Sequence, residues 1–406
     1  MGMIDTVRSV VQLRPIELDP VTRRLARAAD VGDLRRIAKR RLPAGVFDYI
    51  DGGAEDELSL ERNVSGFRRL ELRPRVLRDV AKIDTTTTIL GKPRPLPLVL
   101  SPTGFTRIAD PQGELAVARS AARLGIPYSL STMGTRSIEE VASVSNGPLW
   151  FQVYTWKDRG LVKDLLARAA DADYEAIILT VDTAVLGRRE RDVRRGYTLP
   201  PKVGLDTILD GILHPSWTVD FLRNDPIKFA SVSSNNDADD GSSAVSLSEY
   251  INSQFDPALS WADVEWLQSV WDGPIVLKGI QTVADAKLAV DAGVDAIALS
   301  NHGGRQIDGA PSIIELVEPV AQEVGGSIEI LCDGGLRRGS DIVKALALGA
   351  TACMAGRAYL YGLGAAGERG VDHVLQFLVE GMERTMALSG TQQVSDISRE
   401  LVAWRD

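Results

Sequence analysis

The chain has 406 residues, 44% of them hydrophobic and 25% charged, which is ordinary composition for a globular protein with a large core. Its net charge of −9 argues against general nucleic-acid binding, because phosphate backbones demand a basic face. The basic run 35–41 is expected to be the solvated face of a helix. Cys332 and Cys353 lie in apolar runs without metal-ligand spacing, so we expect a reducing compartment, no metal and no disulfide framework.

The sequence shows neither a signal peptide nor an apolar run long enough to cross a bilayer, and this predicts where the protein is located. Residues 1–20 contain no cationic segment followed by an apolar stretch of signal-peptide length. No apolar run approaches the ~20 residues needed to cross a bilayer. We therefore expect a cytoplasmic protein. Peripheral contact with the inner face of the membrane stays open, because a short amphipathic segment can supply it.

The first part of the chain is expected to be helical. Residues 1–30 are interpreted as an N-terminal extension, and the segment before about residue 95 as a helical entry to the main domain. Pro43 is placed near the start of a helix through Phe47 and Tyr49, because the first turn of a helix tolerates proline.

From Pro97 onward, short apolar runs alternate with longer stretches of helical spacing. Continuous apolar runs are typical of parallel strands buried on both faces. Eight runs predict an α/β fold, a closed (β/α)8 TIM barrel over residues 31–390, followed by a C-terminal tail at 391–406. The runs are Leu98–Ser101, Tyr128–Ser131, Trp150–Tyr154, Ala176–Asp182, Pro274–Gly279, Ala296–Asn301, Ile328–Asp333 and Ala352–Arg357. The clearest helices are 114–124, 137–144, 161–172, 283–292 and 340–348, with Gly125, Gly293 and Gly349 at the ends of three of them.

A long insertion, 187–259, interrupts the alternation after the fourth strand. Its portion 233–243 is polar enough to be mobile. A loop of this length on the catalytic side of a barrel is typically a lid or a binding loop.

Polar side chains stand at the ends of nearly all the predicted strands. Barrel enzymes build their active sites at the C-terminal ends of the strands, and a purely structural barrel has no reason to place polar groups there. The groups are Pro102–Gly104, Ser131, Gln152 with Tyr154, Thr180 with Asp182, Lys278, His302 with Arg305, Asp333–Gly335, and Gly356–Arg357.

The last two strand ends predict a phosphate site. Glycines in the turns 333–337 and 355–357 allow close backbone approach, and barrels commonly bind phosphate at these two positions. Arg337 and Arg357 can each present a planar fork of N–H donors to phosphate oxygens. The plainer alternative is two tight turns with solvated arginines.

The run Ser300-Asn301-His302-Gly303-Gly304-Arg305-Gln306 is the most specific motif in the chain. A histidine is the natural general base near neutral pH, and an arginine three residues later can grip a carboxylate with two hydrogen bonds. This pairing suits an acid substrate whose α-carbon or hydroxyl loses a proton.

At this motif the chain resembles the FMN-dependent α-hydroxy acid oxidases and dehydrogenases, and within them the bacterial flavin-type L-lactate dehydrogenases. The resemblance runs from about residue 33 to about residue 388 and includes further motifs. These are Phe47–Tyr49 with Gly52–Asp56, Ser101–Gly104, Phe151–Tyr154, and Leu179–Thr183 with Gly187–Arg189.

The resemblance implies FMN as cofactor and oxidation of an (S)-2-hydroxy acid, with L-lactate as the expected substrate, to the 2-oxo acid. Arg305 and Arg189 would hold the substrate carboxylate, with a hydrogen bond from Tyr49, and Tyr154 would contact the hydroxyl. Taken singly, Tyr49 is equally well a core aromatic, and Arg189 part of a solvated basic loop.

The resemblance also implies how charge moves in the site. His302 would take the hydroxyl proton while hydride passes to flavin N5, and Asp182 would stabilise the resulting imidazolium. Lys278 would stabilise the negative charge of the reduced ring. The plainer roles are a turn cap for Asp182 and a snorkelling side chain for Lys278. The residues expected to bind FMN are Pro102, Thr103, Gly104, Ser131, Gln152, Thr180, Lys278, Ser300, Asp333, Gly334, Gly335, Arg337, Gly356 and Arg357.

Two positions depart from the oxidase pattern of the family. Gly104 stands where many oxidases have alanine, so we expect a quinone or a protein carrier as electron acceptor in preference to O2. Met133 replaces a bulky aromatic residue, which favours a roomier pocket for longer or aryl side chains. The resemblance further implies a homo-oligomer, a tetramer or an octamer. NAD is not expected, because the chain lacks a dinucleotide fingerprint.

Three rival interpretations stay open at this point. Another FMN barrel enzyme, such as an isopentenyl diphosphate isomerase or a nucleotide dehydrogenase, would share the phosphate turns without needing the histidine and arginine set. A maturase would use the same site on a modified peptide. A non-catalytic flavin-binding protein would need none of the proton-transfer residues.

Overall fold

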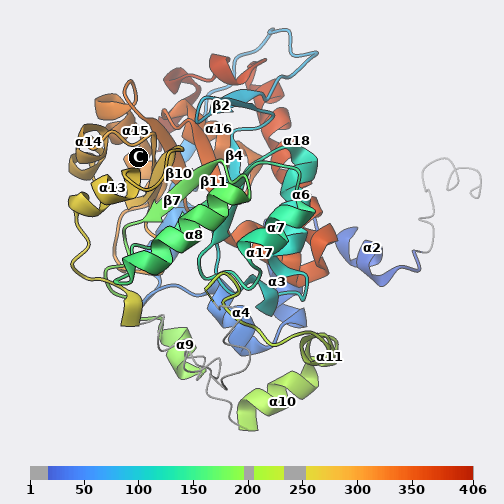
Figure 1. Ribbon diagram of the computed structural model, residues 1–406. Helices are drawn as coiled ribbons and strands as arrows, with labels where there is room; N and C mark the ends of the chain where they lie inside the picture. The colour runs from blue at the N-terminus through green and yellow to red at the C-terminus, as the bar shows by residue number, and fades with distance from the viewer. Residues whose placement is uncertain (1–16, 196–204, 233–252, 406) are drawn as a thin grey trace, which may run out of the picture.

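The barrel predicted from the apolar runs is present and closed. The computed structural model describes residues 17–195, 205–232 and 253–405, so the polar stretch 233–243 lies outside the described residues. Eight parallel strands follow one another around the barrel in the order β10-β11-β4-β5-β6-β7-β8-β9, with helices outside them (Figure 1). They are β4 Leu98–Leu100, β5 Tyr128–Ser131, β6 Leu149–Val153, β7 Ala176–Thr180, β8 Ile275–Ile280, β9 Ala296–Ser300, β10 Glu329–Asp333 and β11 Ala352–Ala355.

The five helices expected from the sequence are all found, within two residues of their predicted ends. Gly125 caps α6 in a left-handed conformation, and Gly293 and Gly349 also have positive φ just after α14 and α16. The outer helices are α6 Gly113–Leu124, α7 Ile138–Val144, α8 Arg159–Asp171, α13 Trp261–Gln268, α14 Val283–Asp291, α15 Ile313–Val324, α16 Gly339–Ala347, α17 Arg357–Ala366 and α18 Glu368–Ser389.

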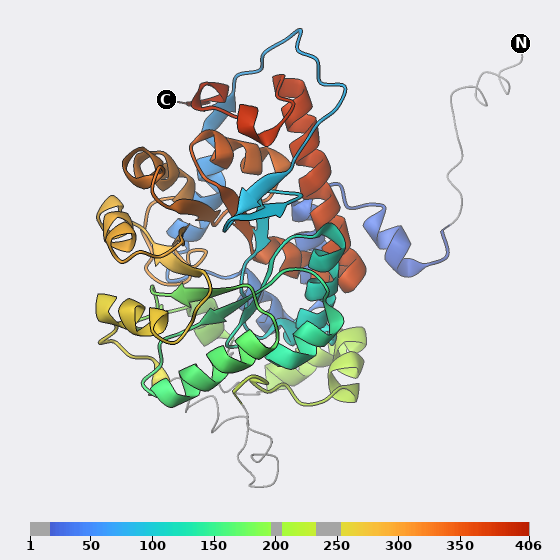
Figure 2. The ribbon, with the colours of Figure 1, turned by 45° about the horizontal axis from the view of Figure 1, so that its top comes forward.

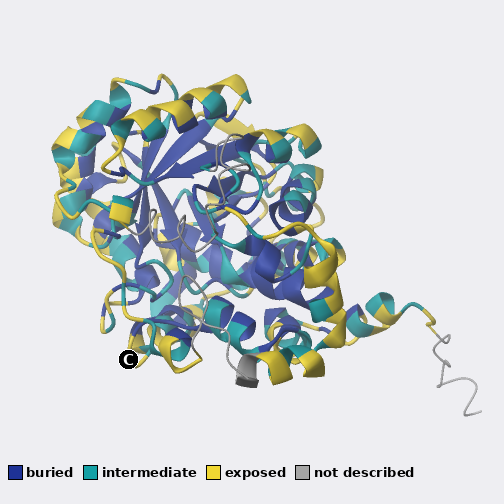
Figure 3. Cartoon of the chain, turned by 60° about the horizontal axis from the view of Figure 1, so that its bottom comes forward, coloured by how far each residue is buried: buried dark blue, intermediate teal, exposed yellow. Residues whose placement is uncertain are grey.

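The inside of the barrel is a packed core that is open at one end. Trp150, Ile178, Val276 and Leu331 belong to one fully buried cluster of side chains. The barrel strands are drawn in the buried colour in Figure 3, with exposed segments on the outer helices. At the N-terminal end of the strands, Ile89 of a hairpin (β2 Thr87–Ile89, β3 Lys92–Arg94) packs into this core. Because that end is plugged, the C-terminal end is the one available for a ligand.

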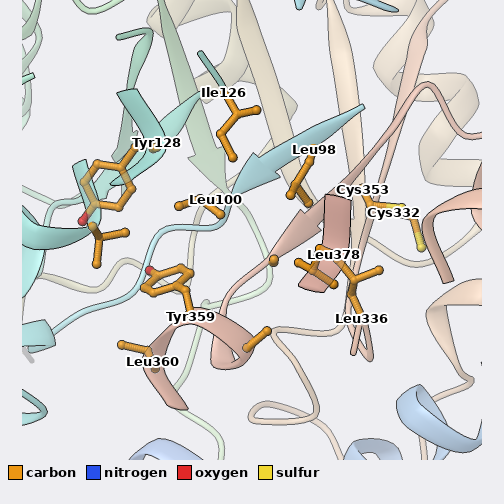
Figure 4. Close-up of a cluster of buried hydrophobic side chains, with 14 of the residues drawn as sticks. Leu98, Leu100, Ile126, Tyr128, Cys332, Leu336, Cys353, Tyr359, Leu360 and Leu378 are labelled. Atoms are coloured by element: carbon orange, nitrogen blue, oxygen red, sulfur yellow. The ribbon is translucent and has the colours of Figure 1, made fainter. Parts of the chain in front are cut away.

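A larger apolar core lies between the strands and the helices. Figure 4 shows part of it, where Cys332 and Cys353 lie on neighbouring strands among Leu98, Leu336 and Leu378. Both thiols are buried and free, so they act as small apolar side chains in this layer.

The segments before and after the barrel pack against it. The C-terminal strand β12 (Val402–Trp404) pairs antiparallel with β1 (Leu70–Leu72), although the two lie at opposite ends of the chain. The N-terminal helices are α2 Pro20–Leu25, α3 Val31–Arg41, α4 Ala44–Asp51 and α5 Leu58–Arg68, and Pro43 is the N-cap of α4 as predicted. Helix α2 lies at the edge of the molecule, and α3 packs on α17 (Figure 2).

The insertion contains α9 (Glu190–Arg194), α10 (Leu205–Leu213) and α11 (Pro215–Arg223). Several hydrogen bonds attach it to the barrel and to α4. Trp217 Nε1 donates to the carbonyl of Ile108 at 2.7 Å, and Arg107 Nη2 donates to that of Asp225 at 2.7 Å. The amide of Ala44 donates to Asp210 Oδ2 at 2.5 Å. The described part of the insertion is therefore attached beside the open end of the barrel.

Candidate active site

A cavity opens at the C-terminal ends of the strands. The space between its walls is about 1350 Å³, a figure that includes open solvent at the mouth. The cavity is lined by residues from many different strand ends, as expected of a barrel active site. The predicted site residues that line it are Tyr49, Pro102, Thr103, Gly104, Ser131, Gln152, Tyr154, Thr180, Arg189, Lys278, His302, Arg305, Asp333, Gly334, Gly335, Arg337, Gly356 and Arg357.

His302 is held by Asp182, which follows β7. The distance from His302 Nδ1 to Asp182 Oδ1 is 2.9 Å, so Nδ1 is engaged and Nε2 is left for a ligand. His302 has a φ of +58°, an unusual conformation for a residue with a β-carbon, which the glycines after it accommodate. Burial lowers the pKa of His302 while Asp182 opposes the shift, so the imidazole is neutral at pH 7. A neutral, oriented imidazole is the form that a general base requires.

Two half-buried arginines carry positive charge into the cavity. Arg305 Nη1 donates to the carbonyls of Tyr49 (2.7 Å) and Gly52 (3.0 Å), and its guanidinium stands 5.0 Å from the centre of the Tyr49 ring. Burial and neighbouring Arg189 lower the pKa of Arg305. Arg189 Nε is buried and has no hydrogen-bond partner among the described residues. Two cations that repel each other in this way are stabilised by an anionic ligand between them.

Lys278 forms a buried ion pair beneath the cavity. Its Nζ lies 3.0 Å from Asp333 Oδ2 and 3.1 Å from Ser300 Oγ. Burial disfavours both charges, yet the pKa of Asp333 is lowered and that of Lys278 is raised, because each group keeps the other charged. Ser101 Oγ also donates to Asp333, at 2.7 Å.

Ser300 has a different position from the one expected of a cofactor ligand. It is fully buried and is not among the residues that line the cavity. Its hydroxyl donates to Asp333 and accepts from the amide of His302 at 3.1 Å. Ser300 therefore ties the lysine–aspartate pair to the backbone of the histidine.

A row of polar side chains crosses neighbouring strand ends. Ser131 Oγ donates to Gln152 Oε1 at 2.9 Å, and Gln152 Nε2 donates to Thr180 Oγ1 at 3.0 Å. All three residues are buried and line the cavity, so they present an amide and hydroxyl groups in a fixed order. Such a wall suits a flat heterocycle with ring nitrogens and carbonyls.

The two predicted phosphate turns lie at another side of the cavity. Gly334 and Gly335 have φ values of +145° and +82°, and a β-carbon on Gly335 would stand 1.9 Å from the carbonyl oxygen of Asn63. Gly356 caps α17, whose first amides lack partners within the helix. Arg337 lies over the Tyr361 ring at 5.6 Å. Gly335 is thus required by its close contact with Asn63 of α5, and the first amides of α17 are the groups that can receive an anion.

Arg357 is engaged differently from the phosphate fork that the sequence suggested. Its guanidinium donates to the carbonyls of Ile50 (3.1 Å), Gly303 (2.7 Å) and Gly52 (2.7 Å). Three of its five N–H donors are therefore used to join α4 to the loop that carries His302.

Three residues that line the cavity beside Met133 were not marked by the sequence. Phe105, Leu186 and Phe255 line the cavity with Met133, and Phe255 stands 5.2 Å from the Tyr154 ring. A β-carbon on Gly104 would lie 2.9 Å from that of Met133. A larger residue at position 104 would therefore require Met133 to shift. No local motif marks Phe255, because the insertion brings it here from far along the chain.

Comparison with known proteins identifies the family. The family model for FMN-dependent dehydrogenase matches residues 38–404. The chain belongs to this family. A Mycobacterium tuberculosis protein provisionally named L-lactate dehydrogenase is 47% identical over 96% of this chain and 92% of its own. Spinach (Spinacia oleracea) glycolate oxidase is 42% identical over 92% of this chain and 95% of its own. The crystal structure of the monotopic membrane protein (S)-mandelate dehydrogenase superposes with a TM-score of 0.89, at 38% identity, over 93% of this chain and all of that one.

The cofactor of this family member is FMN, and the enzyme acts on the CH–OH group of a hydroxy acid. The residues present fit the cofactor. A polar wall for the flat ring, a buried lysine and a pair of glycine turns lie around one cavity. The chain therefore has what an FMN enzyme of this class requires of its own side chains.

Proposed function

We propose that the enzyme oxidises a small (S)-2-hydroxy acid, L-lactate in the first instance, to the 2-oxo acid. The observation that carries the proposal is the His302–Asp182 pair at 2.9 Å, in one cavity with the cations of Arg189 and Arg305. A carboxylate and a hydroxyl on adjacent carbons match this arrangement of two anion-binding groups and one base.

Each side chain of the site has a separate role in this reaction. Arg189 and Arg305 bind and orient the substrate carboxylate, with Tyr49 beside them. Tyr154 is half-buried, and desolvation raises its pKa, so it stays protonated and can donate to the substrate hydroxyl. His302 Nε2 takes the hydroxyl proton, and Asp182 stabilises the charged imidazole. FMN, when bound, supplies the two-electron acceptor for the hydride from the α-carbon.

Lys278 places a permanent positive charge below the cofactor side of the cavity, where electron density accumulates during the reaction. The acceptor that reoxidises the enzyme is proposed to be a quinone or a protein carrier. Support for this comes from Gly104, which stands where many oxidases of the family have alanine.

The first test is anaerobic mixing of the purified enzyme with L-lactate while the flavin absorption band is followed. We expect the flavin band to bleach rapidly after mixing. The band should recover slowly when air is admitted and rapidly when a quinone analogue is added. Fast recovery in air would contradict the proposed acceptor. Absence of bleaching with a panel of aliphatic and aryl (S)-2-hydroxy acids would overturn the proposed function, and turnover of a modified peptide alone would favour the maturase.

We also propose that α10 and α11 contact an anionic membrane surface. No helix among the described residues has the length and apolarity to cross a bilayer. The two helices nevertheless expose a series of large apolar side chains, with Leu213 and Leu222 as much as 77% and 74% exposed. Contiguous exposed apolar surface marks interaction sites. The series is Ile208, Leu209, Ile212, Leu213, Val219, Phe221 and Leu222.

The charges nearby favour lipid headgroups as the partner. One groove on α2 and α3 is lined by five arginines, and Asp33 is the one acidic residue among those that line it. The same helix α3 reaches α11 through Arg41, which lines a small hollow together with Phe221. An apolar face beside a basic groove is the pattern that binds anionic bilayers. The arginines are Arg23, Arg24, Arg27, Arg36 and Arg40. The monotopic (S)-mandelate dehydrogenase supports the same interpretation.

Flotation with lipid vesicles tests this contact. The wild-type enzyme should float with vesicles containing anionic phospholipid, and much less with neutral ones or at high salt. The double substitution Ile212→Asp and Leu222→Asp should reduce the bound fraction at least about fivefold, because two charges must then enter the interface. Leu388→Asp, at a side chain that is 72% exposed on α18, is the matched control. If the double variant floats normally but changes the oligomeric state, a second copy of the chain covers this face instead.

A further inference from the structure

An ion cluster around a buried carboxylate joins three elements that carry predicted site residues. Its centre is Asp51, which lies on α4 two residues after Tyr49 and is 3% exposed. Asp51 Oδ2 accepts from Arg191 Nη1 at 2.9 Å, and Asp51 Oδ1 accepts from the Tyr361 hydroxyl at 2.7 Å. Arg35 of α3 donates to both carboxylate oxygens, at 2.5 and 2.7 Å.

Arg191 extends the cluster to two further carboxylates. Its Nη2 pairs with Glu57, and its Nη1 lies 3.7 Å from Asp48. Glu57 in turn accepts from the amide of Gly53 at 2.8 Å. One guanidinium thus bridges three carboxylates, which a lysine, with its single charged nitrogen, cannot do with the same geometry.

The position of Arg191 explains why the cluster matters for the site. Arg191 is on α9, whose N-cap is Arg189, and the whole helix has five residues. A helix this short has no stability of its own, so its place is set by tertiary contacts. Tyr361 lies on α17, four residues after Arg357. The cluster therefore fixes the segment of Arg189 relative to Tyr49 and to the helix at the phosphate turns.

Arg189 itself is anchored weakly. Its Nε is buried without a hydrogen-bond partner among the described residues, and Arg305 repels it. The contacts made by the neighbouring residues Arg188 and Arg191 therefore hold Arg189 in place against the repulsion from Arg305. The backbone bond from the Glu55 amide to the Arg188 carbonyl, at 3.0 Å, joins the same two segments.

We propose that Arg191 and Asp51 are positioning residues that hold Arg189 in place for the substrate carboxylate. Neither touches the substrate in this interpretation, and both act through α9. This inference rests on the proposed function, because it assigns carboxylate binding to Arg189.

Steady-state kinetics of the FMN-loaded enzyme with L-lactate test it. In Arg191→Met, KM should rise at least about tenfold while kcat changes less than about threefold, because uniform carboxylate binding is lost. The flavin spectrum and FMN content should stay unchanged. Arg191→Lys keeps a positive charge, so its KM should lie between those of the wild type and Arg191→Met. Arg195→Met is the matched control, since Arg195 belongs to the same turn but pairs with Asp48 alone, and its KM should change less than about twofold.

Hydrogen exchange supplies a readout that does not depend on turnover. Amides of residues 188–194 should exchange at least about tenfold faster in Arg191→Met than in the wild type or in Arg195→Met. If Arg191→Met does not fold, Tyr361→Phe, which removes one hydrogen bond to Asp51, should still raise KM about threefold.

The outcomes separate the two proposals. A wild-type enzyme that no 2-hydroxy acid reduces would overturn the proposed function. An active wild-type enzyme together with an Arg191→Met variant of unchanged KM and exchange rates would overturn the positioning role alone. Equal losses in kcat and FMN content would also overturn it, because they would indicate general damage to the fold.

Discussion

Replacing His302 by asparagine should slow flavin reduction by the 2-hydroxy acid by about 10²–10⁴-fold, the usual contribution of a general base. Asparagine is suited to this test because it tolerates a left-handed backbone, and His302 has a φ of +58°. FMN content and the thermal midpoint should therefore change little. The measurement is anaerobic stopped-flow reduction of the FMN-loaded variant, followed at the flavin band.

The pH dependence gives a second measurement on the same group. The reaction needs neutral His302, so kcat/KM rises as the pH rises through the pKa of this residue. Burial lowers that pKa below its ordinary value of 6.5, so the acid limb in the wild type should lie below pH 6.5. His373→Gln is the matched control, because His373 contacts the carbonyl of Ala28 at 3.2 Å, away from the cavity. Retention of the full reduction rate in His302→Asn would show that another group is the base.

Replacing Lys278 by methionine should both destabilise the protein and nearly abolish flavin reduction. The side chains of Lys278 and Asp333 are only 4% and 10% exposed, so the variant leaves an uncompensated carboxylate in the core. Breaking a buried pair in this way costs about 3–5 kcal/mol. Urea unfolding of the FMN-loaded protein measures the loss, and stopped-flow reduction measures the rate.

A double variant separates the two effects of Lys278. Lys278→Met with Asp333→Asn removes both charges, and the hydroxyls of Ser101 and Ser300 can still bond the new amide. Part of the stability should return. The reduction rate should stay low, because no cation then offsets the charge that develops on the cofactor side. Recovery of the rate in the double variant would show that Lys278 serves the fold and not the reaction.

Most of the fold could be predicted from the sequence, because a buried parallel strand and its helix are local patterns. Each strand is a short apolar run, and each run ends at the polar residue where the chain turns. His302 and Lys278 were found this way. The ends of α6, α14 and α16 were marked by glycines whose positive φ no other residue adopts cheaply.

The partners of the polar groups could not be predicted, since they depend on contacts between distant parts of the chain. The guanidinium of Arg357 can bind either a phosphate or backbone carbonyls, and the fold supplies a carbonyl from a segment 307 residues away. Ser300 was placed correctly at a strand end, but its hydrogen bond to Asp333 depends on the neighbouring strand.

The sequence by itself determined the barrel, the side on which chemistry takes place and most of the polar side chains that line it. These follow from hydrophobic periodicity and from polar residues at strand ends, both of which are local properties. The tertiary structure alone decided that Asp51 and Arg191 lock α9 onto α4, that Phe255 reaches the cavity mouth, and that α10 and α11 keep an apolar face outward. The physical reason is that ion pairing and burial are properties of three-dimensional neighbours, and these residues lie far apart in the chain.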